Sequence, residues 1–416
     1  MIKKYPVAII GAGFAAQELA ETLLPTFKPI LLVSAYNGGD TYLDQITELL
    51  SGQNSSLKES LGSLSELIHV TEGPCHFTGL TSFQINDELY EADQIVIATG
   101  AQPTIPSIQG AEEFQLPTPV EFFSGNPVKS VAIIGAGPVG VATAMLAHQK
   151  GMSVTLFTKG RRILTQEEPE ISEVVQLFLE KQGINVQVRS HLIQIKKIQN
   201  KVYILWEKDA ERHETYFEET VIATGMKPNT NSFQLEKCGI HIDLGGRIAT
   251  DDRMRCSKKK IWAMGPSTGT FHSGLERHQA QMISHNLSAA FYDQQRIELE
   301  PYPTLFPFIP SFSRIGLREE EAKLKYKDLL TIKAPMKIKG DKTSGILKIS
   351  ARKRTAEIIG VHMFGEGADS LISFFDLVMR AQIPLTEING AHHLPPFSPS
   401  ESARKAIDLW LEESEK

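Results

Sequence analysis

Cysteine is scarce in this sequence. Its 416 residues include three, Cys75, Cys238 and Cys256, which lie far apart and form no Cys-x-x-Cys pattern. This spacing does not imply a disulfide framework and offers no cluster of thiols for a metal ion. We therefore predict no metal site and interpret the cysteines as buried structural thiols, the common role of isolated cysteine.

A long apolar run and an excess of positive charge are also missing. No stretch approaches the roughly 20 apolar residues that a membrane-spanning helix needs. The net charge is −6 and there is no basic run, which argues against nucleic acid and anionic membranes as partners. The start, "MIKKYPVAIIGAGF", has the lysines and apolar run of a signal peptide but no small-residue cleavage site. We interpret it as the first strand of a cytoplasmic protein.

What the sequence does contain is a glycine turn close to its start. In "YPVAIIGAGFAAQELAETLLP", an apolar strand leads into Gly11, Gly13 and Ala16, and an alanine-rich helix then ends at Pro25. The apolar segment "KPILLVS" follows at the spacing of a strand–helix–strand unit. Such a turn brings backbone amides and the positive end of a helix to a pyrophosphate.

A second glycine turn follows the same plan. In "KSVAIIGAGPVGVATAMLAHQKGMSVTLFTKG", an apolar strand leads into Gly135, Gly137 and Gly140, and the helix after it ends at Gly151 before another apolar strand. One such turn alone is weak evidence. Two complete units in one chain indicate two dinucleotide-binding domains.

The rest of the chain indicates how these units are connected. The segments "ADQIVIATGAQP" and "FEETVIATGMKPN" each end an apolar strand in Ala-Thr-Gly, a pattern expected of a buried strand that leads into a crossing between domains. From about residue 300 the pattern changes, because "GILKISARKRTAEIIGVHMFG" alternates like an antiparallel hairpin and "ADSLISFFDLVMRAQI" is an apolar-faced helix. These segments predict a third, α+β domain.

In this order, the segments resemble the FAD-dependent pyridine nucleotide-disulfide oxidoreductases, the family of dihydrolipoamide dehydrogenase, glutathione reductase and mercuric reductase. The resemblance covers nearly the whole chain, including "IWAMGPSTGTFHSGLERHQAQMISHNL" and "AEIIGVHMFGEGADSLI". It implies an α/β protein with two Rossmann-like domains, for FAD and NAD(P), and a C-terminal α+β dimerisation domain. We expect the FAD domain at 1–110 and 245–300, the NAD(P)H domain at 111–244 and the dimerisation domain at 301–416.

The sequence departs from the family at the redox centre. Family members carry Gly-Gly-x-Cys after the second strand, then a second cysteine and a lysine, whereas "GGDTYLDQI" has Thr41 at the first cysteine. The glutamate that pairs with that lysine falls at Ala142. Loss of both members of a buried ion pair can leave stability nearly unchanged, whereas loss of one member leaves a costly unpaired charge. The paired loss of the lysine and the glutamate therefore indicates a concerted change of this site. Without a thiolate, disulfide reduction, mercuric reduction and single-cysteine peroxidase chemistry are excluded.

The resemblance also implies flavin contacts, two of which are altered. The acid expected for the adenosine ribose is replaced by Ser34 or Ala35, and the Gly-Asp that holds the ribityl chain reads Gly265-Pro266. Proline offers neither a carboxylate nor an N–H, so we expect FAD to bind more weakly than in the family. Ser273 is a candidate N-cap for the last FAD helix. The FAD contacts that we expect are Gly11, Gly13, Ala16, Ser34, Gly100, Gly265 and Ser273.

The NAD(P)H side is better kept. Thr158, Lys159, Arg161 and Arg162 stand where an NAD site carries an acid, which would repel a 2′-phosphate. These cations favour NADPH over NADH, although "KGRR" is alternatively a solvated turn. The NAD(P)H contacts that we expect are Gly135, Gly137, Gly140, Lys159, Arg161 and Gly225.

The last segment, "AHHLPPFSPSESARKA", resembles two branches of the family. One branch uses a histidine and a glutamate that reach across the dimer as acid and base, and these align with Pro396 and Glu401. In the NADH oxidase and coenzyme A-disulfide reductase branch, a tyrosine aligns with His393. His393 and Glu401 are our candidate catalytic residues, although paired loop histidines are commonly surface residues. A tail of this kind implies a homodimer.

Two hypotheses follow. The first is an FAD-dependent NAD(P)H oxidoreductase without a redox disulfide, which passes electrons from flavin directly to a quinone, dioxygen or another small acceptor. The alternative is a nucleotide-binding dimer that has lost catalysis and serves as a sensor or scaffold. A yellow protein that NADPH bleaches would be the first, and a colourless protein the second.

Overall fold

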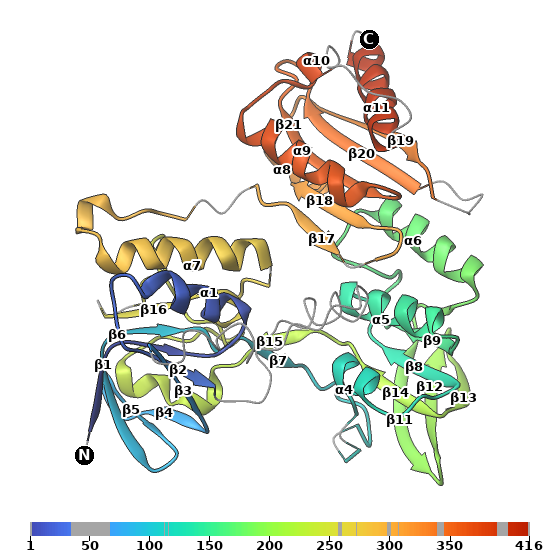
Figure 1. The fold of residues 1–416 in the computed structure, drawn as a ribbon. Helices are drawn as coiled ribbons and strands as arrows, with labels where there is room; N and C mark the ends of the chain where they lie inside the picture. The colour runs from blue at the N-terminus through green and yellow to red at the C-terminus, as the bar shows by residue number, and fades with distance from the viewer. Residues whose placement is uncertain are drawn as a thin grey trace. The chain divides into compact units, whose positions relative to one another are not determined.

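The computed structural model describes residues 2–34, 67–111, 113–114, 116–256, 260–271, 273–297, 301–306, 308–338, 345–388 and 398–414. The chain forms two compact units, and each unit combines two separate segments (Figure 1). The first unit consists of 1–104 and 226–299, and the second of 105–225 and 300–416.

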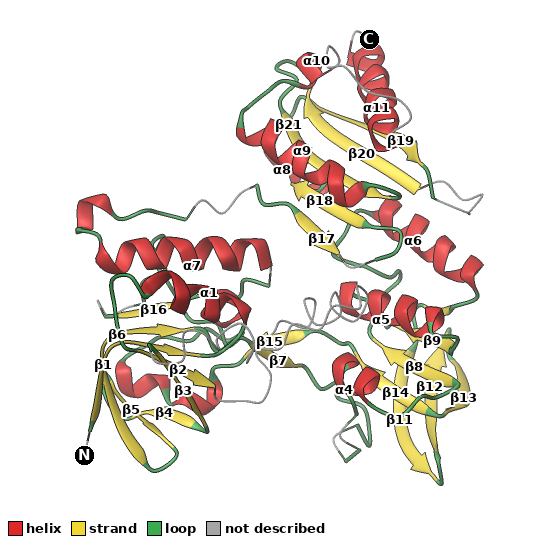
Figure 2. Cartoon of the chain, viewed as in Figure 1, coloured by secondary structure: helices red, strands yellow, loops and turns green. Residues whose placement is uncertain are grey.

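The first unit is an α/β structure built on one mixed sheet (Figure 2). Its elements are β1 (Lys3–Ile10), α1 (Phe14–Leu23), β2 (Ile30–Ser34), β3 (Ile68–Glu72), β4 (Cys75–Phe77), β5 (Ser82–Ile85), β6 (Glu88–Ile97), β7 (Ala101–Pro103), β15 (Met226–Pro228), η1 (Asn231–Phe233), η2 (Leu235–Cys238), β16 (Ile261–Ala263), η3 (Gly265–Thr268), α7 (Ser273–Ser288) and η4 (Phe291–Asp293). The sheet order is β3-β2-β1-β6-β5-β4, with β16 beside β6. Strands β3, β2, β1, β6 and β16 pair in parallel. Strand β5 pairs antiparallel with both β4 and β6.

Successive side chains of β1 point to opposite faces of this sheet, and both faces are buried. Val7 and Ile9 pack into a cluster with residues of α1 and α7, while Ala8 and Ile10 pack into a second cluster with residues of η1 and η2. A strand buried on both faces reads as a continuous apolar run, as β1 does.

The first segment of the second unit forms another parallel sheet, in the order β10-β9-β8-β14, beside an antiparallel sheet in the order β11-β12-β13. Helix α5 connects β8 to β9, and α6 connects β9 to β10. The elements are α4 (Pro119–Ser124), β8 (Ser130–Ile134), α5 (Pro138–Gln149), β9 (Ser153–Phe157), α6 (Pro169–Gln182), β10 (Asn185–Gln187), β11 (His191–Ile198), β12 (Lys201–Lys208), β13 (Glu211–Phe217) and β14 (Glu219–Ile222).

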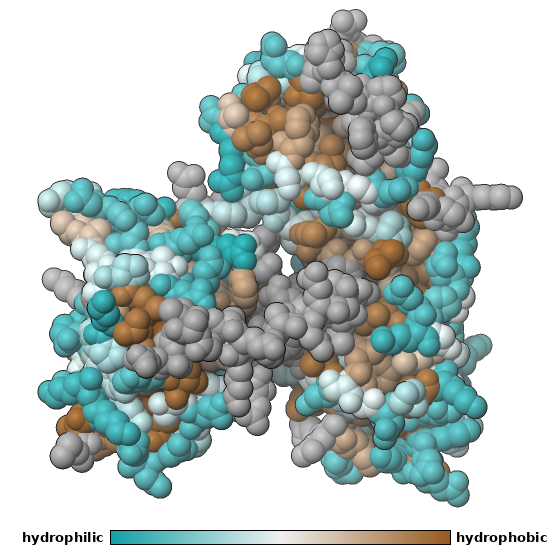
Figure 3. Space-filling view, viewed as in Figure 1, coloured by the Kyte–Doolittle hydropathy of each residue, from teal (hydrophilic) through white to brown (hydrophobic). Residues whose placement is uncertain are grey.

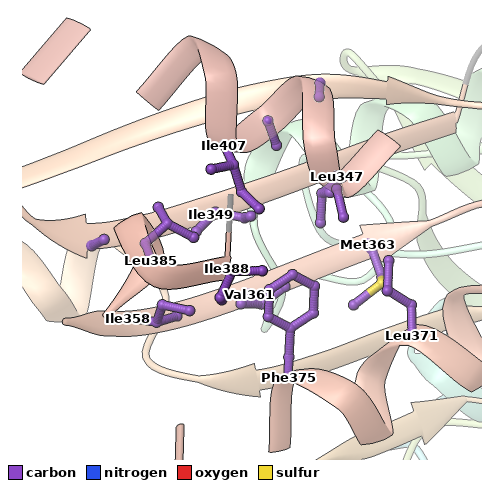
Figure 4. Close-up of a cluster of buried hydrophobic side chains, with 14 of the residues drawn as sticks. Leu347, Ile349, Ile358, Val361, Met363, Leu371, Phe375, Leu385, Ile388 and Ile407 are labelled. Atoms are coloured by element: carbon purple, nitrogen blue, oxygen red, sulfur yellow. The ribbon is translucent and has the colours of Figure 1, made fainter. Parts of the chain in front are cut away.

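The C-terminal segment of the second unit forms an antiparallel sheet with helices against it. The elements are β17 (Thr304–Phe306), β18 (Phe312–Gly316), α8 (Glu319–Lys325), β19 (Leu329–Met336), β20 (Gly345–Arg352), β21 (Ile358–Phe364), α9 (Ala368–Arg380), α10 (Leu385–Ile388) and α11 (Ser398–Ser414). The strand order is β17-β18-β21-β20-β19. One face of this sheet packs on α9 and α11 through an apolar cluster that includes Leu347, Val361, Phe375 and Ile407 (Figure 4).

The outer side of α9 is apolar as well, because Phe374 and Leu377 remain exposed. Figure 3 shows hydrophobic residues gathered on the surface of this C-terminal domain. The predicted fold class, two Rossmann-like domains and a C-terminal α+β domain, is confirmed. The domain boundaries expected from the sequence stay a prediction.

Candidate functional site

The first glycine turn joins β1 to α1. Gly11 has φ +130°, and its amide donates to Val33 O at 2.9 Å. A Cβ added at Gly11 would lie 1.9 Å from Ala98 O, so packing alone requires glycine there. Gly13 is the N-cap of α1 and makes no side-chain cap, which leaves the first amides of the helix able to bind an anion.

The second glycine turn repeats this construction between β8 and α5. Gly135 has φ +105°, donates to Phe157 O at 2.8 Å, and would place a Cβ 2.3 Å from Ala223 O. A Cβ added at Gly140 would lie 1.8 Å from Gly135 O. Gly137 differs, because a Cβ there would meet none of the described atoms within 4 Å. This open space before the uncapped N-terminus of α5 fits the pyrophosphate of a dinucleotide.

Each glycine turn is packed against one of the Ala-Thr-Gly segments. Gly11 contacts Ala98, and Gly135 contacts Ala223. The glycines that follow, Gly100 at φ +68° and Gly225 at φ +105°, likewise have none of the described atoms within 4 Å of an added Cβ. After them the chain forms β7 and β15, which pair with each other. Each turn therefore has an open glycine beside it, Gly100 for the first turn and Gly225 for the second.

The positions predicted to hold FAD differ in their surroundings. Ser34 ends β2 and is half-buried, and β3 places Glu72 opposite it in register. Gly265 begins η3, its amide donates to Gln279 Oε1 at 2.8 Å, and Pro266 is buried in that short helix. Helix α7 begins at Ser273, whose side chain lies outside the described residues, so its role as N-cap stays a prediction.

A buried acid lies beside the altered Gly-Pro segment. Glu276, in the first turn of α7, is 5 % exposed, and a Cβ added at Gly265 would lie 3.5 Å from Glu276 Oε2. Our sequence prediction missed this carboxylate. The signal was present, because Ser273 and Glu276 have the Ser-x-x-Glu spacing of a capping box.

The segment after β9 carries the residues predicted to select the nucleotide. Lys159 and Arg161 are exposed and have no hydrogen bond or ion pair among the described residues. Arg162 is used within the segment, donating to Glu167 O at 3.1 Å and Thr165 O at 3.2 Å. Two of the three cations are thus available to a ligand.

Comparison with known sequences identifies the family. Residues 5–282 match the sequence model of the pyridine nucleotide-disulphide oxidoreductases, and residues 302–406 match the dimerisation domain of that family. The chain belongs to this family. The resemblance inferred from the glycine turns and Ala-Thr-Gly segments is confirmed.

Relatives within the family include mercuric reductases. The protein from Lysinibacillus sphaericus is 28 % identical over 76 % of this chain and 59 % of its own length, and that from Staphylococcus aureus is 25 % identical over 84 % and 65 %. The chain therefore spans less than two thirds of the mercuric reductases that it matches. A probable pyridine nucleotide-disulfide oxidoreductase of Escherichia coli, RclA, is 24 % identical over 98 % of this chain and its whole length.

A solved structure gives the same fold. The Cu(II) complex of RclA, an HOCl-induced flavoprotein disulfide reductase from Escherichia coli, superposes with a TM-score of 0.85 at 22 % identity, covering 98 % of this chain and 100 % of that one. At this identity the likeness shows the fold alone.

The cysteines of this family member are buried and free. Burial raises the pKa of Cys75 and of Cys256 to about 12 and that of Cys238 to about 11, so each is a thiol and a poor nucleophile at neutral pH. The prediction that they are buried is confirmed, and their structural role stays a prediction. Ala142, where the family carries a glutamate, is fully buried.

The candidate catalytic residues fall where little is described. His393 lies outside the described residues, and Glu401 lies in α11 with its side chain outside them. Both roles stay predictions. Within the described part of the chain, no helix is long and apolar enough to cross a membrane, and no His, Cys, Asp or Glu cluster could hold a metal ion.

Proposed function

We propose that the chain is an FAD-dependent NAD(P)H oxidoreductase that uses no redox disulfide and delivers electrons directly to a small acceptor such as a quinone or dioxygen. The observation that carries this proposal is the contrast between three buried thiols of raised pKa and two glycine turns that lead into helix N-termini without side-chain caps. Bound flavin would supply the hydride chemistry, and the protein would supply position and exclusion of water.

The chain's own residues would hold the two nucleotides by their phosphates. The amides after Gly13 would bind the FAD pyrophosphate, and those after Gly137 would bind that of the nicotinamide nucleotide. Lys159 and Arg161 would contact a 2′-phosphate, which supports NADPH over NADH. The remaining contacts in this proposal are Ala16, Ser34, Gly100, Gly265 and Ser273 for FAD and Gly135, Gly140 and Gly225 for NADPH.

We further propose a cytoplasmic homodimer. The match to the family's dimerisation domain supports it, as do the exposed Phe374 and Leu377 of α9. In such a dimer His393 and Glu401 would reach the flavin of the partner subunit. Sedimentation that finds a monomer at micromolar concentration would remove this shared-site arrangement.

The direct test is an anaerobic titration of the purified full-length chain with NADPH. A yellow protein whose flavin absorbance is bleached, and recovers on addition of a quinone or dioxygen, supports the proposal. The same sample should not reduce glutathione disulfide, lipoamide or mercuric ion. Turnover of any of these that is lost in Cys75→Ala, Cys238→Ala or Cys256→Ala would show a working thiol and overturn the proposal.

The second candidate function is a nucleotide-binding dimer without catalysis. It is favoured by Pro266, which is buried and lacks the carboxylate of the family's Gly-Asp segment, and by the apolar, fully buried Ala142. A colourless protein that binds NADPH in calorimetry would select this candidate over the first.

A further inference from the structure

The C-terminal sheet has a second, polar face opposite the apolar cluster on α9 and α11. Lys348 on β20 and His362 on β21 are each 1 % exposed on this face, although both are ionisable. Arg314 on β18 lies opposite His362, and Lys333 on β19 lies opposite Lys348, so the four basic side chains form a row across four neighbouring strands. Acidic residues at the start of α6 and on α8 cover them, so the face is an electrostatic contact between the nucleotide domain and the C-terminal domain.

Lys348 is at the centre of this contact. Its Nζ lies 2.8 Å from Glu168 Oε2, 2.9 Å from Glu170 Oε2 and 2.7 Å from Glu319 Oε2. An ammonium group has three N–H donors, so each proton has its own carboxylate. Burial lowers the pKa of Lys348, but the three carboxylates outweigh burial and raise it to about 12. The side chain is therefore held charged and in one geometry.

Two of the acids at the start of α6, Glu168 and Glu170, are each held by two partners. Glu168 Oε1 accepts from the Glu319 amide at 2.6 Å, while its other oxygen binds Lys348. Glu170 binds both Lys333 and Lys348. Glu167 lies 3.1 Å from the Arg314 guanidinium. The start of α6 is thus fixed to the C-terminal domain at the three acidic positions of "EEPE", Glu167, Glu168 and Glu170.

The segment that precedes α6 connects this contact to the nucleotide turn. Residues 158–168 run from the end of β9, past the exposed Lys159 and Arg161, to Glu168. Half-way along, the Leu164 amide donates to Ala136 O at 2.8 Å, between the first two glycines of the second turn. The Ser172 hydroxyl donates to Ile163 O at 2.6 Å. Arg162, next to Arg161, donates to Glu167 O at 3.1 Å, so the cationic end of the segment is bonded to its acidic end.

We propose that Lys348 is a positioning residue for the pyridine-nucleotide site, because it fixes the segment 158–168 through Glu168 and Glu170 and thereby holds Lys159 and Arg161 for a 2′-phosphate. This inference rests on the proposed binding of NADPH at the second glycine turn. The turn has further anchors that do not involve this segment, because the Gly135 amide donates to Phe157 O and Gly135 packs against Ala223. Loss of Lys348 should therefore weaken contacts to the 2′-phosphate more than contacts to the pyrophosphate.

The test is Lys348→Met in the full-length chain, with dissociation constants for NADPH and NADH measured by calorimetry. We expect the constant for NADPH to rise at least about fivefold and that for NADH less than about twofold. Lys348→Arg should restore part of the preference for NADPH. Lys323→Met is the matched control, since Lys323 binds the same Glu319 from the exposed side, and it should leave both constants unchanged.

Glu168→Gln is a second test, which applies if Lys348→Met fails to fold. It keeps the side-chain volume and an oxygen for the Glu319 amide, and it removes the charge that faces Lys348. We expect the same selective loss of NADPH binding and faster hydrogen exchange of the amides of 158–168. Folded variants that bind NADPH as the parent does, or that lose NADPH and NADH equally, would overturn the inference. A parent that binds neither nucleotide, or does not prefer NADPH, would instead overturn the function on which it rests.

Discussion

The two glycine turns use the same backbone device but differ in what surrounds it. In both, the first glycine has a positive φ and packs against the alanine of an Ala-Thr-Gly segment. The third position is Ala16 in the first turn, whereas Gly140 in the second has no room for a methyl group. The comparison teaches that the first glycine is required by packing, with or without a ligand. Gly137, with open space before it, is the position where glycine is unexplained without a ligand.

The largest expected effects come from the first glycine of each turn. Gly11→Ala and Gly135→Ala each combine a left-handed backbone with a backbone clash, and we expect each to destabilise its unit by about 2–5 kcal/mol. Gly11→Ala should be the more severe, because its Cβ would lie 1.9 Å from Ala98 O against 2.3 Å from Ala223 O for Gly135. Urea unfolding of both variants measures this. Equal stability to the parent would contradict the packing argument.

A substitution at Gly137 should affect binding and leave stability almost unchanged. Gly137→Val places a side chain in the space expected for the pyrophosphate, so NADPH affinity should fall about a hundredfold, or about 3 kcal/mol. Flavin content, which we propose to depend on the other turn, should stay as in the parent. Calorimetry and the visible spectrum check the two expectations, and a variant that binds NADPH normally would refute the site.

Acid should weaken the second unit through His362. Burial, with smaller contributions from the cations Arg314 and Lys348, lowers the pKa of His362 from 6.5 to about 4, although the nearby Glu168 acts to raise it. Between pH 6.5 and 4.5 the unfolded chain binds a proton that the folded protein excludes, so stability falls as pH drops, by on the order of 2–3 kcal/mol. Glu170, whose pKa is lowered to about 2 because hydrogen bonds from Lys333 and Lys348 outweigh burial, loses its contribution only at lower pH.

Tryptophan fluorescence can follow this effect in one unit. Trp206 and Trp410 lie in the second unit and Trp262 in the first, so a Trp262→Phe background reports on the second unit. In that background, His362→Gln should flatten the dependence of urea midpoint on pH between 6.5 and 4.5. A slope that persists would show that another group is responsible.

The smallest effect concerns the choice of nucleotide. Lys159→Ala with Arg161→Ala should remove most of a preference for NADPH, about 1–3 kcal/mol for charge-assisted contacts. Lys150→Ala, at the far end of α5, controls for long-range charge. Equal affinity of the parent for NADPH and NADH would refute the idea without any variant.

Local sterics made the fold and the turns predictable. A strand that runs into Gly11-x-Gly13 or Gly135-x-Gly137 has few other conformations, and the apolar runs of β1 and β8 show burial on both faces. The contact of Lys348 with Glu168 could not be predicted in the same way. In "GILKISAR" the lysine looks like a solvent-facing strand residue, and Glu168 and Glu170 look like ordinary acids at a helix start. Their meeting depends on packing between segments 180 residues apart.

The pairing of β7 with β15 offers a way to produce the first unit as a separate protein. Met226 lies opposite Pro103 in an antiparallel register, so the chain leaves the unit and returns to it at adjacent points. A two-residue Asn-Gly turn that joins 103 to 226 would close a β-hairpin in place of the intervening residues. The first unit would then be a minimal domain encoded by 1–103 and 226–299, and its folding could be followed through Trp262 alone. Failure of this domain to fold would mean that the excised residues stabilise it.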